Sequence, residues 1–343
     1  MTWRAACLAL CHGLLDGLAA HAAPPERIWI DTDAACDGGA RHDPDDCLAL
    51  YALATSPQVQ IVGVSAVFGN AKEVDSLRVL ARLADLLGNA GYALPTPLPG
   101  ADRPVRKRRG QPPSDAATDL CAALEDAPLT IVALGPLTNI ADALSACPGH
   151  ADRISRLIFV GGSHAGHVFH PAEGAMSHAK FGHGPIFRDL NVRMDLDAVQ
   201  AVFSRDIPVV LTPYVLARQM EIGAADIAAF AERDEAAGYI ASASLPWLTY
   251  WEQNIGRDGF YPFDLMAAAV LLAPDAMLCS PRRVALMPDR KISPVFPPRG
   301  LLFDPPAGRT DARPVLACLK LERGGPDAIR HLLLPPPGDD GHA

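Results

Sequence analysis

The segment RIWIDTDAACDGGARHDPDDCLAL, residues 27–50, begins as an apolar strand over 27–31 and ends as an apolar helix over 45–53. It contains six aspartates and no glutamate. Carboxylates gathered at a strand end repel one another unless protons or a cation neutralise them. A hard divalent ion such as calcium accepts carboxylate, carbonyl and water oxygens in flexible geometry. The segment therefore predicts a cation site where the first strand ends.

A simpler interpretation covers part of this cluster. Asp43, Asp45 and Asp46 stand where acids favour the positive end of the following helix, so one or two of them are explained by capping alone. Capping does not explain Asp31 and Asp33 as well, because both precede the loop. We retain the cation site as the better explanation.

Strands and helices alternate along the chain, which predicts an α/β fold with an open, mostly parallel (mixed) sheet and helices on both faces. In such a sheet ligands bind at the carboxyl ends of the strands, so Asp31 and Asp33 are expected at the mouth of the site, beside the loops after Leu134 and Val160. The expected strands are 27–31, 59–68, 129–134, 154–160, 207–211, 283–287 and 314–321; the expected helices are 45–53, 71–87, one from 136, 195–203, 224–237, 240–251, 263–272 and 327–333.

The composition predicts an acidic globular protein. The 343 residues are 49% hydrophobic and carry a net charge of -9, which argues against a nucleic-acid surface. The basic run 103–109 is expected to be a solvated loop. No segment after residue 23 is apolar for long enough to span a membrane. We predict a single domain over 24–334 and a flexible tail over 335–343.

Residues 1–23 resemble a secretory signal peptide, with Arg4, an apolar stretch and a small-residue ending. His12 and Asp16 interrupt the apolar stretch, so an ordinary N-terminal extension is the alternative. A cleaved signal implies a periplasmic or secreted protein, and an extension implies a cytoplasmic one.

Six cysteines follow residue 23, and none forms a Cys-x-x-Cys pair, so a zinc site is not expected. Several lie on apolar stretches, which favours buried free thiols, while export would permit disulfides. They are Cys36, Cys47, Cys121, Cys147, Cys279 and Cys318.

Ordered motifs along the chain resemble the inosine-uridine-preferring nucleoside hydrolase family. Asp31-Thr32-Asp33 and, after an enlarged loop, Asp45-Asp46 are similar to the metal-binding signature of that family. Further similar segments are VSAVFGN (64–70), LTIVALGPLTNIADAL (129–144), LIFVGG (157–162), RDLNVRMDLDAVQAV (188–202), YPFDLMAAAVLL (261–272) and PPRGLLFD (297–304). Several independent motifs in the same order make the resemblance specific.

The resemblance implies an enzyme that hydrolyses the N-glycosidic bond of a ribonucleoside to base and ribose. It implies Ca²⁺ bound by Asp33, Asp46, the carbonyl of Leu134 and Asp264, with Asp33 as the catalytic base that activates a calcium-bound water. The substrate-binding residues it implies are Asp45, Asn70, Asp189 and Asn191. The implied partner is a small-molecule nucleoside, and relatives assemble as homodimers or homotetramers.

Two departures from the family pattern concern, in turn, the leaving base and recognition of the 5′ position of the ribose. Phe263 stands where inosine-uridine-preferring members place a His that protonates the base, and Asp189 replaces a Glu. The loop between Asp33 and Asp45 is enlarged and carries Arg41 and His42, which could reach the site. Other candidate proton donors, each more simply a solvated loop residue, are His164, His167, His170, His178 and His183.

Two other functions remain open on the residues. A degenerate, non-catalytic calcium- or ribose-binding member of the same fold is compatible with Phe263. A haloacid dehalogenase-type phosphohydrolase also begins with a strand and Asp-x-Asp, but it needs a later Lys and a paired acidic motif that this chain lacks in order.

Overall fold

The computed structural model describes residues 24–39, 41–167 and 189–334. The predicted signal segment, the predicted tail and three candidate histidines, His170, His178 and His183, lie outside these residues. No helix within them is both long and apolar enough to cross a membrane.

The core is one mixed sheet in the order β2-β1-β3-β4-β5-β10-β8-β9, parallel from β2 to β10 and antiparallel from β10 to β9. The predicted α/β class with a mostly parallel sheet is confirmed. Its strands are β1 (Glu26–Thr32), β2 (Val59–Ala66), β3 (Leu129–Ala133), β4 (Ile154–Phe159), β5 (Val209–Leu211), β8 (Met277–Pro288), β9 (Arg299–Phe303) and β10 (Arg313–Leu321). A two-stranded ribbon joins β6 (Ile222–Gly223) to β7 (Gly259–Phe260).

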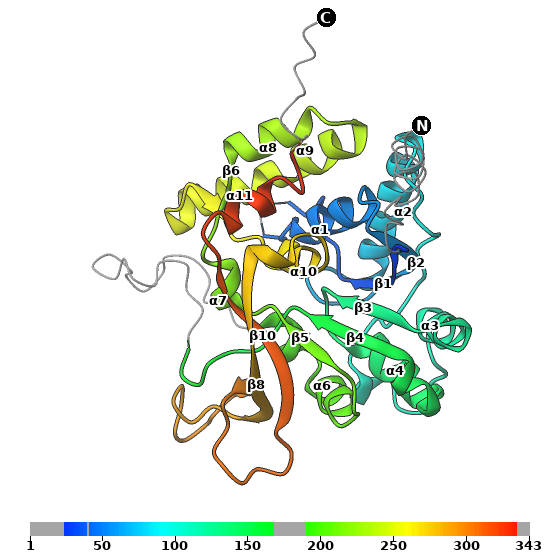
Figure 1. The fold of residues 1–343 in the computed structure, drawn as a ribbon, viewed down its shortest axis with the longest axis vertical. Helices are drawn as coiled ribbons and strands as arrows, with labels where there is room; N and C mark the ends of the chain where they lie inside the picture. The colour runs from blue at the N-terminus through cyan, green and yellow to red at the C-terminus, as the bar shows by residue number, and fades with distance from the viewer. Residues whose placement is uncertain (1–23, 40, 168–188, 335–343) are drawn as a thin grey trace, which may run out of the picture.

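Helices cover both faces of the sheet (Figure 1). One face is covered by α1 (Asp45–Ala54), α2 (Glu73–Asn89), α8 (Ala224–Ala231), α9 (Glu235–Tyr250), α10 (Phe263–Leu272) and α11 (Gly325–Arg330). The other is covered by α3 (Asp115–Asp126), α4 (Thr138–Ala146) and α6 (Leu196–Phe203). Two short helices, α5 (Leu190–Met194) and α7 (Tyr214–Ala217), follow the loops at the carboxyl ends of β4 and β5.

Alternation along β1 divides the core in two. Ile28 and Ile30 pack with the face that contains α1 and α10, whereas Trp29 packs with the face that contains α3 and α4. Both faces of this strand are buried, which explains why its sequence reads as a nearly continuous apolar run.

The six cysteines form three disulfides, so the interpretation as free thiols is wrong. Which cysteines form a disulfide depends on how close they lie in the folded chain, and their spacing in the sequence does not reveal that distance. The pairs are Cys36–Cys47, Cys121–Cys147 and Cys279–Cys318. The last pair joins register partners on β8 and β10.

Helix α3 and strand β9 are among the elements that were not predicted. Helix α3 begins after Ser114, whose hydroxyl accepts the Ala117 amide at 3.2 Å, a helix start that follows a proline-rich stretch. Strand β9 lies in the segment 297–304, where no strand was expected, and its pairing with β8 makes it an edge strand.

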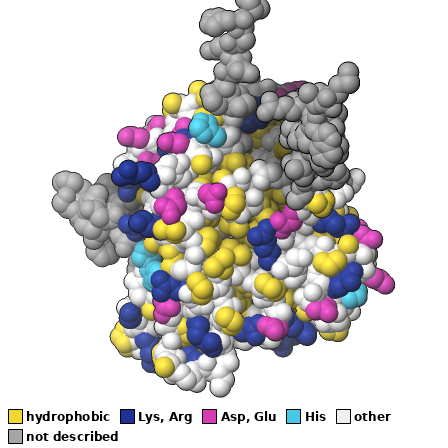
Figure 2. Space-filling view, viewed as in Figure 1, with side chains coloured by type: hydrophobic (Ala, Val, Ile, Leu, Met, Phe, Trp, Pro, Cys, Tyr) yellow, Lys and Arg dark blue, Asp and Glu magenta, His cyan; other side chains and the backbone are white. Residues whose placement is uncertain are grey.

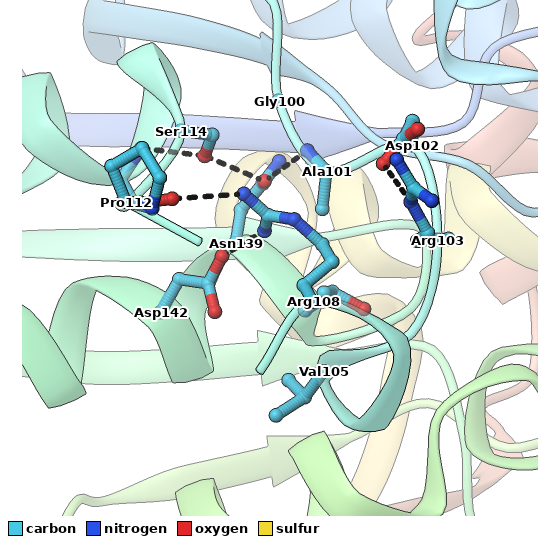
Figure 3. A network of polar contacts seen from close by, with 12 residues as sticks. Gly100, Ala101, Asp102, Arg103, Val105, Arg108, Pro112, Ser114, Asn139 and Asp142 are labelled. Atoms are coloured by element: carbon cyan, nitrogen blue, oxygen red, sulfur yellow. Dashed lines mark hydrogen bonds and ion pairs between the residues drawn. The ribbon is translucent and has the colours of Figure 1, made fainter. Parts of the chain in front are cut away.

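The loop before α3 is fixed to α4 by polar contacts (Figure 3). Asn139 accepts the Ala101 amide at 2.7 Å and the Ser114 hydroxyl at 3.3 Å. Arg108 forms an ion pair with Asp142, and its side chain is only 9% exposed. The expectation of a fully solvated basic loop is therefore wrong for Arg108. On the face shown in Figure 2, Lys and Arg side chains alternate with acidic ones and do not gather in one basic patch.

Candidate active site

A cavity of about 220 Å³ opens at the carboxyl ends of the parallel strands. One water molecule takes up roughly 30 Å³ in the liquid, so the cavity has room for a small organic ligand. It is lined by Asp33, Arg41, Asp43, Asp45, Asp46, Asn70, Leu134, Val160, Gly161, Gly162, Asp189, Leu190, Asn191, Tyr214, Trp247, Phe263 and Asp264. The set includes all eight residues that the resemblance assigns to the metal and the ribose: Asp33, Asp45, Asp46, Asn70, Leu134, Asp189, Asn191 and Asp264.

Three of the carboxylates form a tight cluster. Oxygen atoms of Asp45, Asp46 and Asp264 lie within 4.8 Å of one another, and the three residues are 1%, 2% and 5% exposed. They occupy the first turns of α1 and α10, which pack against each other. The Asp264 amide donates to Asp45 Oδ2 at 2.7 Å and fixes the two turns together.

Asp33 joins this cluster from just beyond the end of β1. The Asn70 amide donates to Asp33 Oδ2 at 2.6 Å. A Cβ atom on Gly69 would lie 1.8 Å from the same oxygen, so only glycine leaves room for the carboxylate. The opposite side is closed by Gly135, where a Cβ atom would lie 3.1 Å from Asp33 Cγ.

Burial dominates the titration of these acids. It raises the pKa of Asp33 to about 7, against the opposing hydrogen bond from the Asn70 amide. Burial and neighbouring carboxylates hold the pKa values of Asp46 and Asp264 well above the usual range for Asp. Several buried acids with only oxygen ligands to offer match the donor set of a hard divalent cation, so the residues fit a metal of the calcium type.

Leu134 and Asn191 complete the floor of the cavity. Asn191 Nδ2 donates to the carbonyl of Leu134 at 2.6 Å and to that of Val160 at 3.0 Å. A carbonyl oxygen has two lone pairs, so the Leu134 carbonyl retains acceptor capacity. Asn191 therefore sets the edge of the cavity formed by the ends of β3 and β4.

Asp189 and Asn70 both line the cavity, and both are held by backbone contacts. Asp189 caps α5, where its carboxylate accepts the Gly162 amide at 2.7 Å and the Val192 amide at 3.1 Å. Desolvation raises its pKa to about 6. Asn70 Nδ2 donates to the Asp43 carbonyl at 2.8 Å, which attaches the enlarged first loop to the end of β2.

Asp31 does not face the cavity, contrary to the prediction that it stands at the mouth of the site. Its carboxylate accepts hydrogen bonds from Asn139 Nδ2, at 2.7 Å, and from the Ser65 hydroxyl. The reason is the strand: β1 ends at Thr32, which bonds Asp46 on one face, so Asp31 points to the other face. Asp33 lies past the strand end and is free of that alternation.

Comparison with known proteins identifies the family. Residues 28–308 match the model of inosine-uridine preferring nucleoside hydrolases. The chain belongs to this family. The pyrimidine-specific ribonucleoside hydrolase RihA of Klebsiella pneumoniae (strain 342) is 26% identical over 280 residues, 75% of this nucleoside hydrolase and 84% of the relative. An uncharacterized protein of Schizosaccharomyces pombe is 28% identical over 277 residues, 73% and 81% of the two chains.

Solved nucleoside hydrolases share the fold. A plant nucleoside hydrolase superposes with a TM-score of 0.72 at 20% identity, over 91% of this hydrolase and all of that chain. An inosine-uridine preferring nucleoside hydrolase from Bacillus anthracis gives 0.62 at 17% identity, over 90% and 99% of the two chains.

Part of the lining of the hydrolase cavity is an aromatic wall made of Tyr214, Trp247 and Phe263. Phe263 stacks on Tyr214 with ring centroids 5.8 Å apart. Sequence reasoning missed Tyr214, because it follows a three-residue strand with no motif around it. Tyr261 and Trp251 are buried in the core.

Two of the candidate histidines, His164 and His167, lie in the described part of the loop after β4, and neither lines the cavity. His164 packs on Phe303 with centroids 5.2 Å apart, and His167 packs on the edge of Tyr214 at 5.6 Å. His42 lines a separate cavity behind the first loop, whereas its neighbour Arg41 lines the active-site cavity.

Proposed function

We propose that this hydrolase cleaves the N-glycosidic bond of a ribonucleoside to the free base and ribose, at a calcium ion held by Asp33, Asp46, the Leu134 carbonyl and Asp264. The observation that carries the proposal is the buried acid cluster contributed by the starts of two helices far apart in sequence. When bound, calcium would lower the pKa of a water molecule and hold ribose hydroxyls beside it.

Asp33 is the base in this proposal. Its carboxylate accepts the proton of the attacking water while the water oxygen bonds to C1′ of the ribose. The Asn70 amide and the close approach of Gly69 fix the orientation of that carboxylate. The neighbouring acids favour the positive charge that develops on the sugar ring.

The ribose is assigned to four side chains around the acids. Asp45 accepts a hydrogen bond from the 2′-hydroxyl, and Asn70, Asp189 and Asn191 contact the remaining hydroxyls. Asn191 uses its nitrogen on two backbone carbonyls, so its amide oxygen is the group left to accept from a hydroxyl. Holding the sugar at several points converts binding energy into orientation for attack.

The test is a panel of purine and pyrimidine nucleosides, assayed for base release with calcium, with magnesium and with chelator. We expect calcium-dependent release that the chelator abolishes. Stoichiometric calcium binding without release from any nucleoside would contradict the proposal and favour a non-catalytic calcium- or ribose-binding role, which Phe263 makes the alternative.

Asp33→Asn tests the base directly. We expect turnover to fall by about 10²- to 10⁴-fold, the usual contribution of a positioned base, with an unchanged circular dichroism spectrum. Asp102→Asn, an exposed acid outside the cavity, is the control and should keep full activity. Turnover at the wild-type rate in Asp33→Asn would remove Asp33 from the mechanism.

We also propose that residues 1–23 are a cleaved signal and that 24–334 form the mature domain in an oxidising compartment. Three disulfides among the described cysteines support export, since such bonds persist outside the cytosol. Intact-mass measurement of protein recovered from its native host would show the start of the mature chain. A retained Met1 region would contradict the proposal.

A further inference from the structure

Arg41 is the one Lys or Arg side chain among the described residues that line the active-site cavity. It comes from the enlarged loop between Asp33 and Asp45, and it has no role in the proposed binding of calcium or ribose. The same cavity contains the aromatic wall of Tyr214 and Phe263. A cation therefore shares the cavity with the surface best suited to a flat base.

The ion pairs of the described residues indicate whether the acids neutralise the guanidinium. Six carboxylates line the cavity, yet Arg41 is in none of the ion pairs formed within the described part of the chain. A guanidinium beside the acid floor would pair with one of them at once, because each offers two acceptor oxygens. Arg41 thus lines the cavity without being neutralised by the acid floor, and its guanidinium is available to a ligand.

The loop that carries Arg41 is anchored on both sides. Cys36–Cys47 closes it, and Asp37 forms an ion pair with Arg78 of α2 at 2.6 Å. At the other end the Asp43 backbone is bonded to the Asn70 side chain. The loop is therefore held on both sides of Arg41, whose side chain lines the cavity.

The chemistry of the leaving base supplies a role for a cation there. When the glycosidic bond breaks, its electron pair passes to the nitrogen of the base and spreads onto any conjugated carbonyl oxygen. Phe263 has no proton to donate. A guanidinium stabilises such an oxyanion with two N–H donors and needs no proton transfer.

We infer that Arg41 contacts the departing base and selects nucleosides whose base has a conjugated carbonyl oxygen, the oxo-purines and oxo-pyrimidines. The inference rests on the proposed function. In the step, the water oxygen bonds to C1′ and its proton passes to Asp33. The C–N bond breaks, and the base leaves as an anion bonded to Arg41, then takes a proton from solvent.

A phosphate group is the other anion that an arginine could recognise. The structure favours the base, because a phosphate would have to enter a cavity lined by six carboxylates, whereas the aromatic wall accepts an uncharged ring. Uridine 5′-monophosphate therefore serves as the competing substrate in the test.

The experiment compares wild type, Arg41→Ala, Arg41→Lys and the control Arg106→Ala on uridine, inosine and p-nitrophenyl β-D-riboside. Nitrophenolate leaves without help, so it reports attack and sugar binding alone. We expect Arg41→Ala to lose about 100-fold in kcat/KM on uridine and inosine, the cost of one oxyanion donor, and only a few-fold on the nitrophenyl riboside. Arg41→Lys should recover part of the lost activity. The control Arg106→Ala should keep the wild-type kcat/KM on all three substrates.

The outcomes separate the two proposals. Equal losses on both substrate types, or no loss on either, would overturn the role of Arg41. Turnover of uridine 5′-monophosphate by wild type that Arg41→Ala abolishes would assign Arg41 to phosphate and also overturn it. Calcium affinity, measured by titration calorimetry, should be unchanged in Arg41→Ala. A wild type inactive on every riboside would instead refute the proposed function, and the inference with it.

Discussion

Gly69 shows how a residue without a side chain determines the position of a reactive one. Asp33 Oδ2 occupies the space that a Cβ atom on Gly69 would need, and the next amide, on Asn70, holds that oxygen. Of the two residues that follow β2, Gly69 therefore leaves room for the Asp33 carboxylate, and Asn70 donates a hydrogen bond to it.

We predict that Gly69→Ala displaces the Asp33 carboxylate and lowers both calcium affinity and turnover by about 10-fold or more, as expected when a group that orients a metal ligand is lost. Gly88→Ala is the matched control, because a Cβ atom there meets nothing within 4 Å. Calorimetric calcium titration and initial rates measure the effect. An unaltered calcium affinity in Gly69→Ala would show that Asp33 adapts without cost.

At this scale the motif predicted which acids gather in one place, because Asp33, Asp46 and Asp264 all line the cavity. It failed for Asp31, whose side chain points to the opposite face from Thr32 and bonds Asn139. The difference depends on where β1 ends, and strand ends are set by pairing with β2 and β3 rather than by residue type. It also failed for Tyr214, which no local pattern marks.

Among the elements, the start of α1 and the loop before it form one closed unit. The disulfide joins Cys36, three residues after Asp33, to Cys47, the residue after Asp46, and both cysteines are buried. Asp45 and Asp46 therefore belong to a short ring, residues 36–47, that the disulfide closes. This ring lies between β1 and the rest of α1.

We predict that Cys36→Ser with Cys47→Ser weakens calcium binding by about 10-fold or more, because the ring positions two of the acids. The matched control is Cys121→Ser with Cys147→Ser, which opens a disulfide between α3 and the end of α4, away from the cavity. Calcium titration of both variants distinguishes local positioning from general loss of stability. Equal affinities in the two variants would contradict this role.

Element type was predictable where periodicity was strong, as in α2 and β3, and less so where pairing decides. Strand β9 has only five residues, and it forms by antiparallel pairing with β8 at the edge of the sheet. The disulfides were equally invisible, because Cys279 and Cys318 meet only through the register of β8 with β10.

For the whole molecule, the acid cluster couples stability to pH. In the metal-free protein burial raises the pKa of Asp33 from the ordinary value of 3.8 to about 7, so the folded state binds this proton more tightly than the unfolded state. The resulting stabilisation is complete below about pH 4 and is lost as pH rises towards about 7. Asp46 and Asp264 shift in the same direction.

We therefore predict that the rise in Tm caused by calcium is larger at about pH 7.5 than at about pH 5, because the ion replaces the protons that the cluster would otherwise lose. Thermal unfolding with calcium and with chelator, at both pH values and constant ionic strength, measures it. A calcium-induced shift that does not change with pH would contradict the coupling.

The pairing of Asp45 with Asp264 also has a consequence in time. The amide and carboxylate that meet at 2.7 Å are separated by 219 positions, and α10 is the partner that closes α1. The acids at the start of α1 therefore cannot complete the proposed calcium site until α10, which begins at Phe263, has been made and has packed on α1. Full affinity for the proposed ion would thus appear only after segments far apart in the sequence have docked.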